Sequence, residues 1–237
     1  MKRRVAHRTI HIAKFEGFRR YSVAHFLVAL VIMFITSPFL RLFRGGDLIE
    51  KAIGTLVLLS AVTAIGGRRR TLVTGALLVM PALAAKWIDH LRPGVIPQEV
   101  IFASMLAFAV FVVIHLLRFV LQAPRVNAEV LCAGIATFLM LGLCWAVVFT
   151  LVAKLDPGAF TFTLGHSQYN SMVGFEALYF SIGTLSGVCY GDIIPVSGGA
   201  RMLALLEGMV GLFYLAVLIS RLVSLYSSDK SSSTAAK

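Results

Sequence analysis

The stretch that decides the fold is residues 174–192, which read GFEALYFSIGTLSGVCYGD. Its apolar part, residues 174–185, is long enough for about three helical turns, whereas a helix that crosses a bilayer needs about 20 residues. The part that follows contains Gly187 and Gly191 and is expected to be irregular. Irregular backbone at membrane depth is tolerated only where it is buried in protein or lines a water-filled cavity. We therefore predict a re-entrant helix that enters the membrane and returns as a loop.

Apolar segments surround this stretch and indicate a membrane protein. Hydrophobic residues make up 58% of the chain and charged residues only 14%, whereas soluble domains contain about 25% charged residues. Backbone groups in lipid must hydrogen bond within their own segment, so these segments should be helices. The predicted fold is an all-α membrane protein with six transmembrane helices, in which the re-entrant helix and its loop lie between the fifth and sixth. The six segments are Tyr21–Leu40, Ala52–Gly67, Thr71–Ala85, Val100–Leu117, Val130–Ala153 and Met202–Ser220.

The distribution of charge predicts the orientation in the membrane. The net charge is +11, and 15 of the 22 Lys and Arg residues lie on the side of the predicted spans that also holds both termini. Because cytoplasmic flanks are enriched in Lys and Arg, both termini are expected in the cytoplasm. The basic residues lie at the ends of apolar segments and not along one amphipathic face, so the expected partner is the lipid bilayer and not a nucleic acid.

Missing motifs exclude several function classes. Cys132, Cys144 and Cys189 form no C-x-x-C pair, which argues against a disulfide framework and against a thiolate metal site. The sequence has no Gly-rich phosphate loop, no H-E-x-x-H motif and no nucleophile elbow, so we do not expect an enzyme. It also has no inverted repeat, which argues against a transporter.

Residues 179–195 carry a family resemblance. They read YFSIGTLSGVCYGDIIP, which resembles the pore-helix and filter segment of potassium channels, whose pattern is close to T-x-T-T-V-G-Y-G-D followed by a hydrophobic pair and Pro. The next helix, with its stretches ARMLALLE and LAVLISRLV, resembles the inner helix of small six-span bacterial potassium-channel-like proteins. The similarity covers residues 172–226, and the first four segments are placed by topology alone. The matching filter positions are Thr184, Val188, Tyr190, Gly191, Asp192 and Pro195.

This resemblance implies a domain organisation and a function. Residues 126–226 would form the pore domain, with a pore helix at 172–185 and a filter at 186–192, and residues 21–121 a four-helix peripheral transmembrane region. Four chains would each contribute one loop to a homotetramer, with related channel subunits as the alternative partners. The expected function is a passive monovalent cation channel of the potassium type in the bacterial inner (plasma) membrane. A non-conducting, channel-like membrane subunit with an assembly or signalling role is the alternative.

The resemblance also assigns roles in the filter. The backbone carbonyls of the filter would replace the hydration shell of potassium ions, and no other cofactor is expected. The Tyr179 hydroxyl would bond Asp192, just outside the filter, as a Trp does in many channels. The residues expected to bind ions are Gly187, Val188, Cys189, Tyr190 and Gly191, and those expected to support the filter are Thr184, Ser186, Asp192, Tyr179 and Glu207.

Two filter positions depart from the family pattern. Gly187 stands where the family has Thr, so the hydroxyl ring of the innermost ion site is missing, and the Ser186 side chain is expected to point away from the axis. Cys189 stands where the family has Gly at a left-handed position, which penalises a residue with a Cβ by about 1–2 kcal/mol, or roughly 4–8 kcal/mol over four subunits. We therefore expect weakened potassium selectivity or low conductance. The Cys189 thiol could itself be oxidised or bind soft metals, or be a small buried side chain behind the filter.

Glu207 lies inside the sixth apolar segment. A carboxylate within the membrane is a functional candidate by default. The structural alternative is that Glu207 pairs with Arg201 or with the back of the pore loop.

The two ends of the chain are predicted to be tails. Residues 1–20 form a basic cytoplasmic tail, either an amphipathic helix on the anionic inner leaflet or a solvated positive flank. Residues 227–237 read SSDKSSSTAAK, and this polar, low-complexity composition predicts disorder.

Overall fold

The computed structural model describes most of the chain and confirms the predicted fold class. The predicted basic tail at residues 1–20 lies outside the described residues, so the two interpretations of that tail stay predictions. Six helices in the described part are long and apolar enough to cross a membrane. The structure describes residues 22–40, 46–65, 69–92, 97–163 and 171–234.

Five of the six membrane-spanning helices are longer than the apolar segments that predicted them, because flanking residues continue the helical backbone. The second and third segments, which were the shortest, become helices of 20 and 23 residues. The third of them keeps Pro81 in its interior. The helices are Ser22–Leu40, α2 (Gly46–Ile65), α3 (Arg69–Leu91), α4 (Gln98–Gln122), α5 (Ala128–Leu155), the short α6 (Phe175–Ser186) and α7 (Gly198–Thr234).

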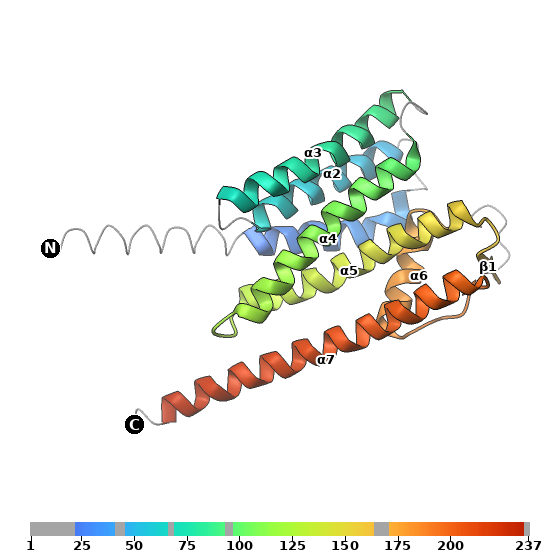
Figure 1. Cartoon of the computed structure of the whole chain (residues 1–237). Coiled ribbons are helices and arrows are strands. Elements are labelled where there is room, and N and C mark those ends of the chain that lie inside the picture. The colour runs from blue at the N-terminus through green and yellow to red at the C-terminus, as the bar shows by residue number, and fades with distance from the viewer. Residues whose placement is uncertain (1–21, 41–45, 66–68, 93–96, 164–170, 235–237) are drawn as a thin grey trace.

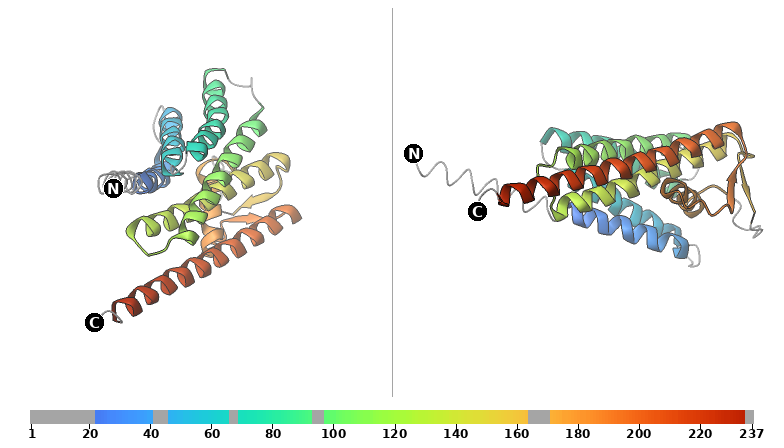
Figure 2. Two further views of the ribbon diagram at one scale, coloured as in Figure 1. Left: turned by 60° about the vertical axis from the view of Figure 1, so that its left-hand side comes forward. Right: turned by 90° about the horizontal axis from the view of Figure 1, so that it is seen from below.

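The helices divide into a peripheral group, helix Ser22–Leu40 with α2 to α4, and a group at the predicted pore, α5 to α7, which we call the pore-side group (Figure 1). Helix Ser22–Leu40, α2, α3 and α4 pack around a core that includes Phe26 and Phe108, both fully buried, and this core continues onto α5. The short α6 lies between α5 and α7, and α7 runs along the side of the molecule away from α2 and α3 (Figures 1 and 2). Helix α5 is therefore the element shared by both groups.

A second core surrounds α6. The ring of Phe149 on α5 meets the rings of Phe160 and Phe180 edge to face, with centroids 5.8 and 4.9 Å apart. Such aromatic pairs add about 0.5–1.5 kcal/mol beyond the apolar area that they bury. Phe160 lies at the start of a short strand and Phe180 on α6, so this cluster ties the loop after α5 to the re-entrant helix.

Two short strands form an antiparallel pair beside α6. Strand β1 (Phe160–Phe162) pairs with β2 (Ile193–Pro195), with Phe160 opposite Pro195 and Phe162 opposite Ile193. Strand β1 was not predicted from the sequence. Because β2 directly follows Asp192, this pairing fixes the chain immediately after residues 186–192, the predicted filter.

The C-terminal end differs from the expected disordered tail. Helix α7 continues through Thr234, so residues 227–234 are helical and only residues 235–237 lie outside the described chain. Helix nucleation is the unfavourable step, whereas each added residue extends an existing helix at little cost. The polar Ser and Lys residues therefore prolong a helix that the apolar part of α7 has already formed.

Candidate functional site

The re-entrant helix α6 is bounded by glycines in left-handed backbone. Gly174, its N-cap, has φ 64°, and Gly187, its C-cap, has φ 76°. The amide of Gly187 donates to the Thr184 carbonyl oxygen at 3.1 Å, which closes the last turn in the manner of a glycine C-cap. The helix begins three residues later than the predicted 172–185 because the chain turns at Gly174.

Glycines on the neighbouring helices let α6 approach closely. A Cβ added at Gly142 of α5 would overlap the Ile182 side chain, and a Cβ added at Gly211 of α7 would overlap the Leu185 carbonyl oxygen. Small residues are the usual means by which membrane helices bring their backbones together. The position of α6 between α5 and α7 therefore depends on these two glycines.

A buried polar contact joins the same three helices. The Ser181 hydroxyl of α6 lies 2.8 Å from the Gly142 carbonyl oxygen of α5 and 2.5 Å from Oε1 of Glu207 on α7. Ser181 and Glu207 are both 0% exposed. Arg201 instead donates from Nε to the Pro195 carbonyl oxygen. The structure thus places Glu207 behind the pore loop and not in a pair with Arg201.

The backbone of the predicted filter, residues 186–192, alternates in handedness. Gly187, Cys189 and Gly191 have φ values of 76°, 43° and 81°, whereas Val188 and Tyr190 between them do not have positive φ. Alternation of left- and right-handed residues turns every second peptide plane, so that successive carbonyl groups can face the same side. Cys189 is the one non-glycine with positive φ in the described chain, at the position where the sequence indicated a left-handed residue.

The inner end of the filter is bonded to the end of α6. The amides of Val188 and Cys189 both donate to the Gly183 carbonyl oxygen, at 2.9 and 3.2 Å. The Ser186 hydroxyl donates back to the Ile182 carbonyl oxygen of its own helix at 2.7 Å. Ser186 therefore does not supply the hydroxyl that Gly187 lacks. Thr184 is buried within α6.

The outer end of the filter is bonded to Tyr179. The Tyr179 side chain forms a hydrogen bond with Asp192, and its ring stacks on Tyr190 with centroids 5.6 Å apart and an interplanar angle of 10°. Burial and the hydrogen bond to Asp192 raise the pKa of Tyr179 to about 12. The phenol is therefore neutral at physiological pH and remains a donor to the Asp192 carboxylate.

Thr163 is a filter contact that the sequence analysis missed. Its amide donates to the Asp192 carbonyl oxygen at 2.9 Å, and its hydroxyl lies 3.0 Å from the same oxygen and 3.3 Å from the Gly191 carbonyl oxygen. Thr163 follows β1, whose pairing with β2 brings it beside the filter. No sequence signal links it to a residue 29 positions away.

Apolar side chains of the filter and of α7 are exposed in the single chain. Val188 is 54% exposed and Tyr190 is 70% exposed. Four apolar residues at helical spacing form one exposed face of α7, which we call the α7 face. Surfaces of this kind in a membrane protein are covered by lipid or by other subunits. The α7 face comprises Met202, Leu205, Met209 and Leu212.

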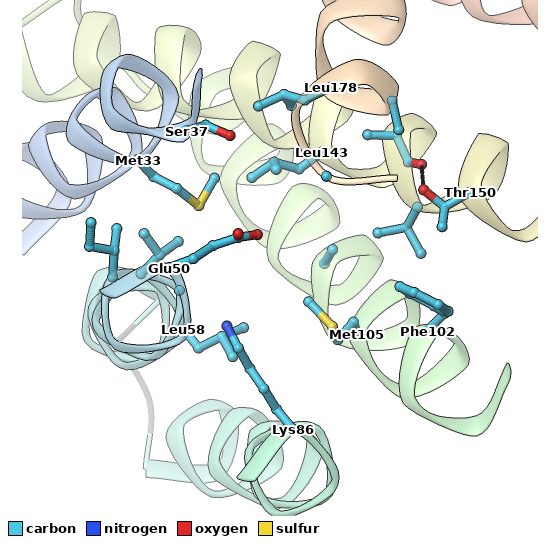
Figure 3. A pocket seen from close by; sticks show the side chains of 18 of the residues that line it. Met33, Ser37, Glu50, Leu58, Lys86, Phe102, Met105, Leu143, Thr150 and Leu178 are labelled. Atoms are coloured by element: carbon cyan, nitrogen blue, oxygen red, sulfur yellow. Dashed lines mark hydrogen bonds between the residues drawn. The ribbon is translucent and has the colours of Figure 1, made fainter. Parts of the chain in front are cut away.

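A cavity of about 270 Å³ separates the peripheral helices from the start of α6. Its lining is mostly apolar, but the Lys86 ammonium of α3 and the Glu50 carboxylate of α2 both point into it (Figure 3). The charge of Glu50 acts on Lys86, so the two groups offset each other within the membrane-spanning region. This cavity is lined by Gly174 and Leu178 but by none of the filter residues 186–192.

Comparison with known proteins identifies the pore-side group. In the described residues, no cluster of three or more His, Cys, Asp or Glu side chains could hold a metal ion. The family model described as an ion channel matches residues 137–228, a range that runs from within α5 through α6 and the filter into α7. No curated protein and no solved structure matches the chain. Residues 137–228 of this integral membrane protein are therefore similar to the ion-channel family, which supports its assignment to the potassium-channel superfamily.

Proposed function

We propose that four copies of this chain form a passive channel for monovalent cations, with potassium as the main ion. The observation that carries the proposal is the alternating backbone at Gly187, Cys189 and Gly191, in a loop held at the end of a re-entrant helix. Filters of this kind bind ions through rings of backbone carbonyls, and four loops complete each ring. The carbonyls of residues 187–190 would supply these rings.

Exposure in the single chain supports the homotetramer. Val188 and Tyr190 are more than half exposed, although both lie in a filter whose inner and outer ends are hydrogen bonded to the rest of the chain. A neighbouring copy would cover these side chains and part of the α7 face. The remaining apolar surface would meet lipid.

The two departures from the family pattern support reduced selectivity. Gly187 provides no side-chain hydroxyl for an innermost site, and Cys189 holds a left-handed backbone that glycine adopts more easily. The Asp192 carboxylate next to the filter would raise the local concentration of cations at the mouth. We therefore propose that potassium is preferred over sodium less strongly than in channels with the unaltered filter sequence.

Membrane placement follows the charge bias. With an even number of spans, both termini lie on the same side, and 15 of the 22 Lys and Arg residues fall on that side. We propose that this side is the cytoplasm and that the membrane is the bacterial plasma membrane.

The test is ion flux through purified protein in liposomes. We expect potassium flux that exceeds sodium flux, and a higher potassium flux in Cys189→Gly, because glycine removes the strain at φ 43°. Cys189→Ala is the matched control, since it removes the thiol but keeps the Cβ, and it should not raise the flux. If neither ion moves and Cys189→Gly restores nothing, the conduction proposal is wrong.

A non-conducting, channel-like subunit is the second candidate. The observation that favours it is Cys189, because a strained residue repeated in four subunits disfavours an open filter by roughly 4–8 kcal/mol. In that case, the wild type would show no flux, while the purified chain would still assemble with itself or with a related subunit.

A further inference from the structure

The Ser181 hydroxyl has two hydrogen-bond partners, Gly142 and Glu207, but only one proton to donate. The Ser181 oxygen lies within hydrogen-bond distance of the Gly142 carbonyl oxygen, at 2.8 Å, and of Glu207 Oε1, at 2.5 Å. A hydroxyl carries one proton, and a carbonyl oxygen can only accept. If Ser181 donates to Gly142, the proton in its short contact with Glu207 has to come from the glutamic acid.

We propose that Glu207 is a neutral carboxylic acid in the folded channel, and that its proton fastens α7 to the re-entrant helix. Oε1–H of Glu207 donates to the Ser181 hydroxyl, and Ser181 donates to the Gly142 carbonyl oxygen of α5. The result is a continuous donor chain from α7 through α6 to α5. Without the proton, the single hydroxyl proton of Ser181 can serve either α5 or α7, but not both.

The second carboxyl oxygen supports the neutral form. Glu207 is 0% exposed, and its Oε2 has no hydrogen-bond partner among the described residues. A buried carboxylate without a cation beside it is strongly unfavourable. In a neutral acid, the carbonyl oxygen without a partner is uncharged, so the missing hydrogen bond costs less. The neutral acid therefore explains both the short contact of Oε1 with Ser181 and the missing partner of Oε2.

No charged group of the described chain balances a negative charge at Glu207. Burial and the Ser181 hydroxyl are the influences that act on this carboxyl group. Arg201, on the same helix, is bonded to Pro195, and Tyr179 is bonded to Asp192. The other titratable groups near the middle of α5 and on α6 are Cys144 and Glu176, and neither acts on Glu207.

The position of this contact gives the proton a role in the filter. The next residue of α7, Gly208, lies beside the Thr184 carbonyl oxygen, and Gly211 lies against Leu185. Thr184 and Leu185 lie in the last turn of α6, whose C-cap is Gly187. Loss of the proton would therefore release the helix end that carries the filter. The effect on conduction rests on the function proposed above, and we expect flux to fall as the pH rises.

Infrared spectroscopy tests the protonation state without reference to conduction. The purified wild-type channel at neutral pH should show the C=O stretch of a protonated carboxylic acid, and Glu207→Gln should remove this band. Glu99→Gln, which changes an exposed carboxyl group in the first turn of α4, should leave the band intact. If the wild-type and Glu207→Gln spectra do not differ in the acid band, the proposal is wrong.

The second measurement compares flux at alkaline and neutral pH within each variant. The wild type and Glu99→Gln should lose flux at alkaline pH. Glu207→Gln should not show this loss, because its amide donates to Ser181 at every pH. The same alkaline loss in Glu207→Gln would overturn the link between the proton and the filter. An acid band in a protein that conducts no ions would instead refute the proposed function and leave Glu207 protonated.

Discussion

Arg221 of α7 donates a hydrogen bond from Nη2 to the carbonyl oxygen of Ala123, at 3.0 Å. Ala123 is the C-cap of α4 and is 5% exposed. The last carbonyls of a helix have no partner within the helix, so this arginine satisfies one of them from 98 residues away. The bond connects the pore-side helix α7 directly to the end of the peripheral group.

Arg221→Gln should weaken this connection. A hydrogen bond from a charged donor contributes about 1.5–3 kcal/mol, so we expect a lower thermal unfolding temperature in detergent. Arg92→Gln is the control, because Arg92 is exposed directly after α3 and lies far from both partners of this bond in the sequence. Equal unfolding temperatures for the two variants would show that the bond to Ala123 adds no stability.

Alanine at Gly211 and at Gly208 should have opposite effects. A Cβ at Gly211 would overlap the Leu185 carbonyl oxygen, whereas a Cβ at Gly208 would lie 3.7 Å from the Thr184 carbonyl oxygen, an ordinary contact. Gly211→Ala should therefore destabilise the protein by about 1–3 kcal/mol. Gly208→Ala should be neutral or stabilising by up to about 1 kcal/mol, because alanine favours helix. Denaturation followed by the loss of helical circular dichroism measures both, and similar stability losses would contradict the packing at Gly211.

Cys189→Gly should stabilise the assembled filter. Relief of the left-handed strain amounts to about 1–2 kcal/mol per chain, offset in part by the greater freedom of glycine in the unfolded state. The measurement is the temperature at which the oligomer dissociates on a mild detergent gel, with Cys189→Ala as control. A gain in both variants would assign the effect to the thiol and not to the backbone.

Thr at position 187 should be harmful when introduced alone. Gly187 has φ 76°, and although an added Cβ would meet open space, a β-branched residue is disfavoured in this backbone region. Gly187→Asn is the matched comparison, because asparagine tolerates left-handed backbone. We expect Gly187→Thr to dissociate at a lower temperature than Gly187→Asn, and the reverse order would show that the loop rearranges around the threonine.

Thr163→Val should loosen the outer end of the filter. It keeps the shape of the side chain but removes the hydroxyl that contacts the carbonyl oxygens of Gly191 and Asp192. The net loss is about 0.5–1.5 kcal/mol. Thr163→Ser keeps the hydroxyl and serves as the control. Hydrogen exchange at residues 191–195 should be faster in the valine variant alone, and equal exchange in both would exclude a role for the hydroxyl.

The sequence predicted the features that the membrane dictates locally. The length of an apolar segment decides whether it spans or returns, so the six spans and the re-entrant helix at residues 174–185 could be read from short windows. Likewise, the family pattern has Gly in left-handed backbone at the position of Cys189, and the structure has φ 43° there. In these cases no distant part of the chain had to be known.

The features that the sequence did not predict join distant segments. Thr163 and Asp192 are brought together by strands of three residues, too short to show a periodic pattern. The sequence places the Glu207 carboxyl group within the membrane, but it leaves Arg201 and the pore loop as alternative partners, because the choice depends on how α7 packs on α6. The predicted disorder of residues 227–234 was wrong for another reason. Their polar composition indicates that they are solvated, but it does not take into account the helix that precedes them and that they extend.

Helix α7 also has a mechanical consequence. Its 37 residues extend about 55 Å at about 1.5 Å per residue, whereas the hydrocarbon core is about 30 Å thick. Its close contact with α6 lies near one end, at Gly208 and Gly211. The longer part of the helix therefore lies on the C-terminal side of this contact and extends past the hydrocarbon core, so that a tilt of α7 about the two glycines would move its C-terminal end about twice as far as its N-terminal end.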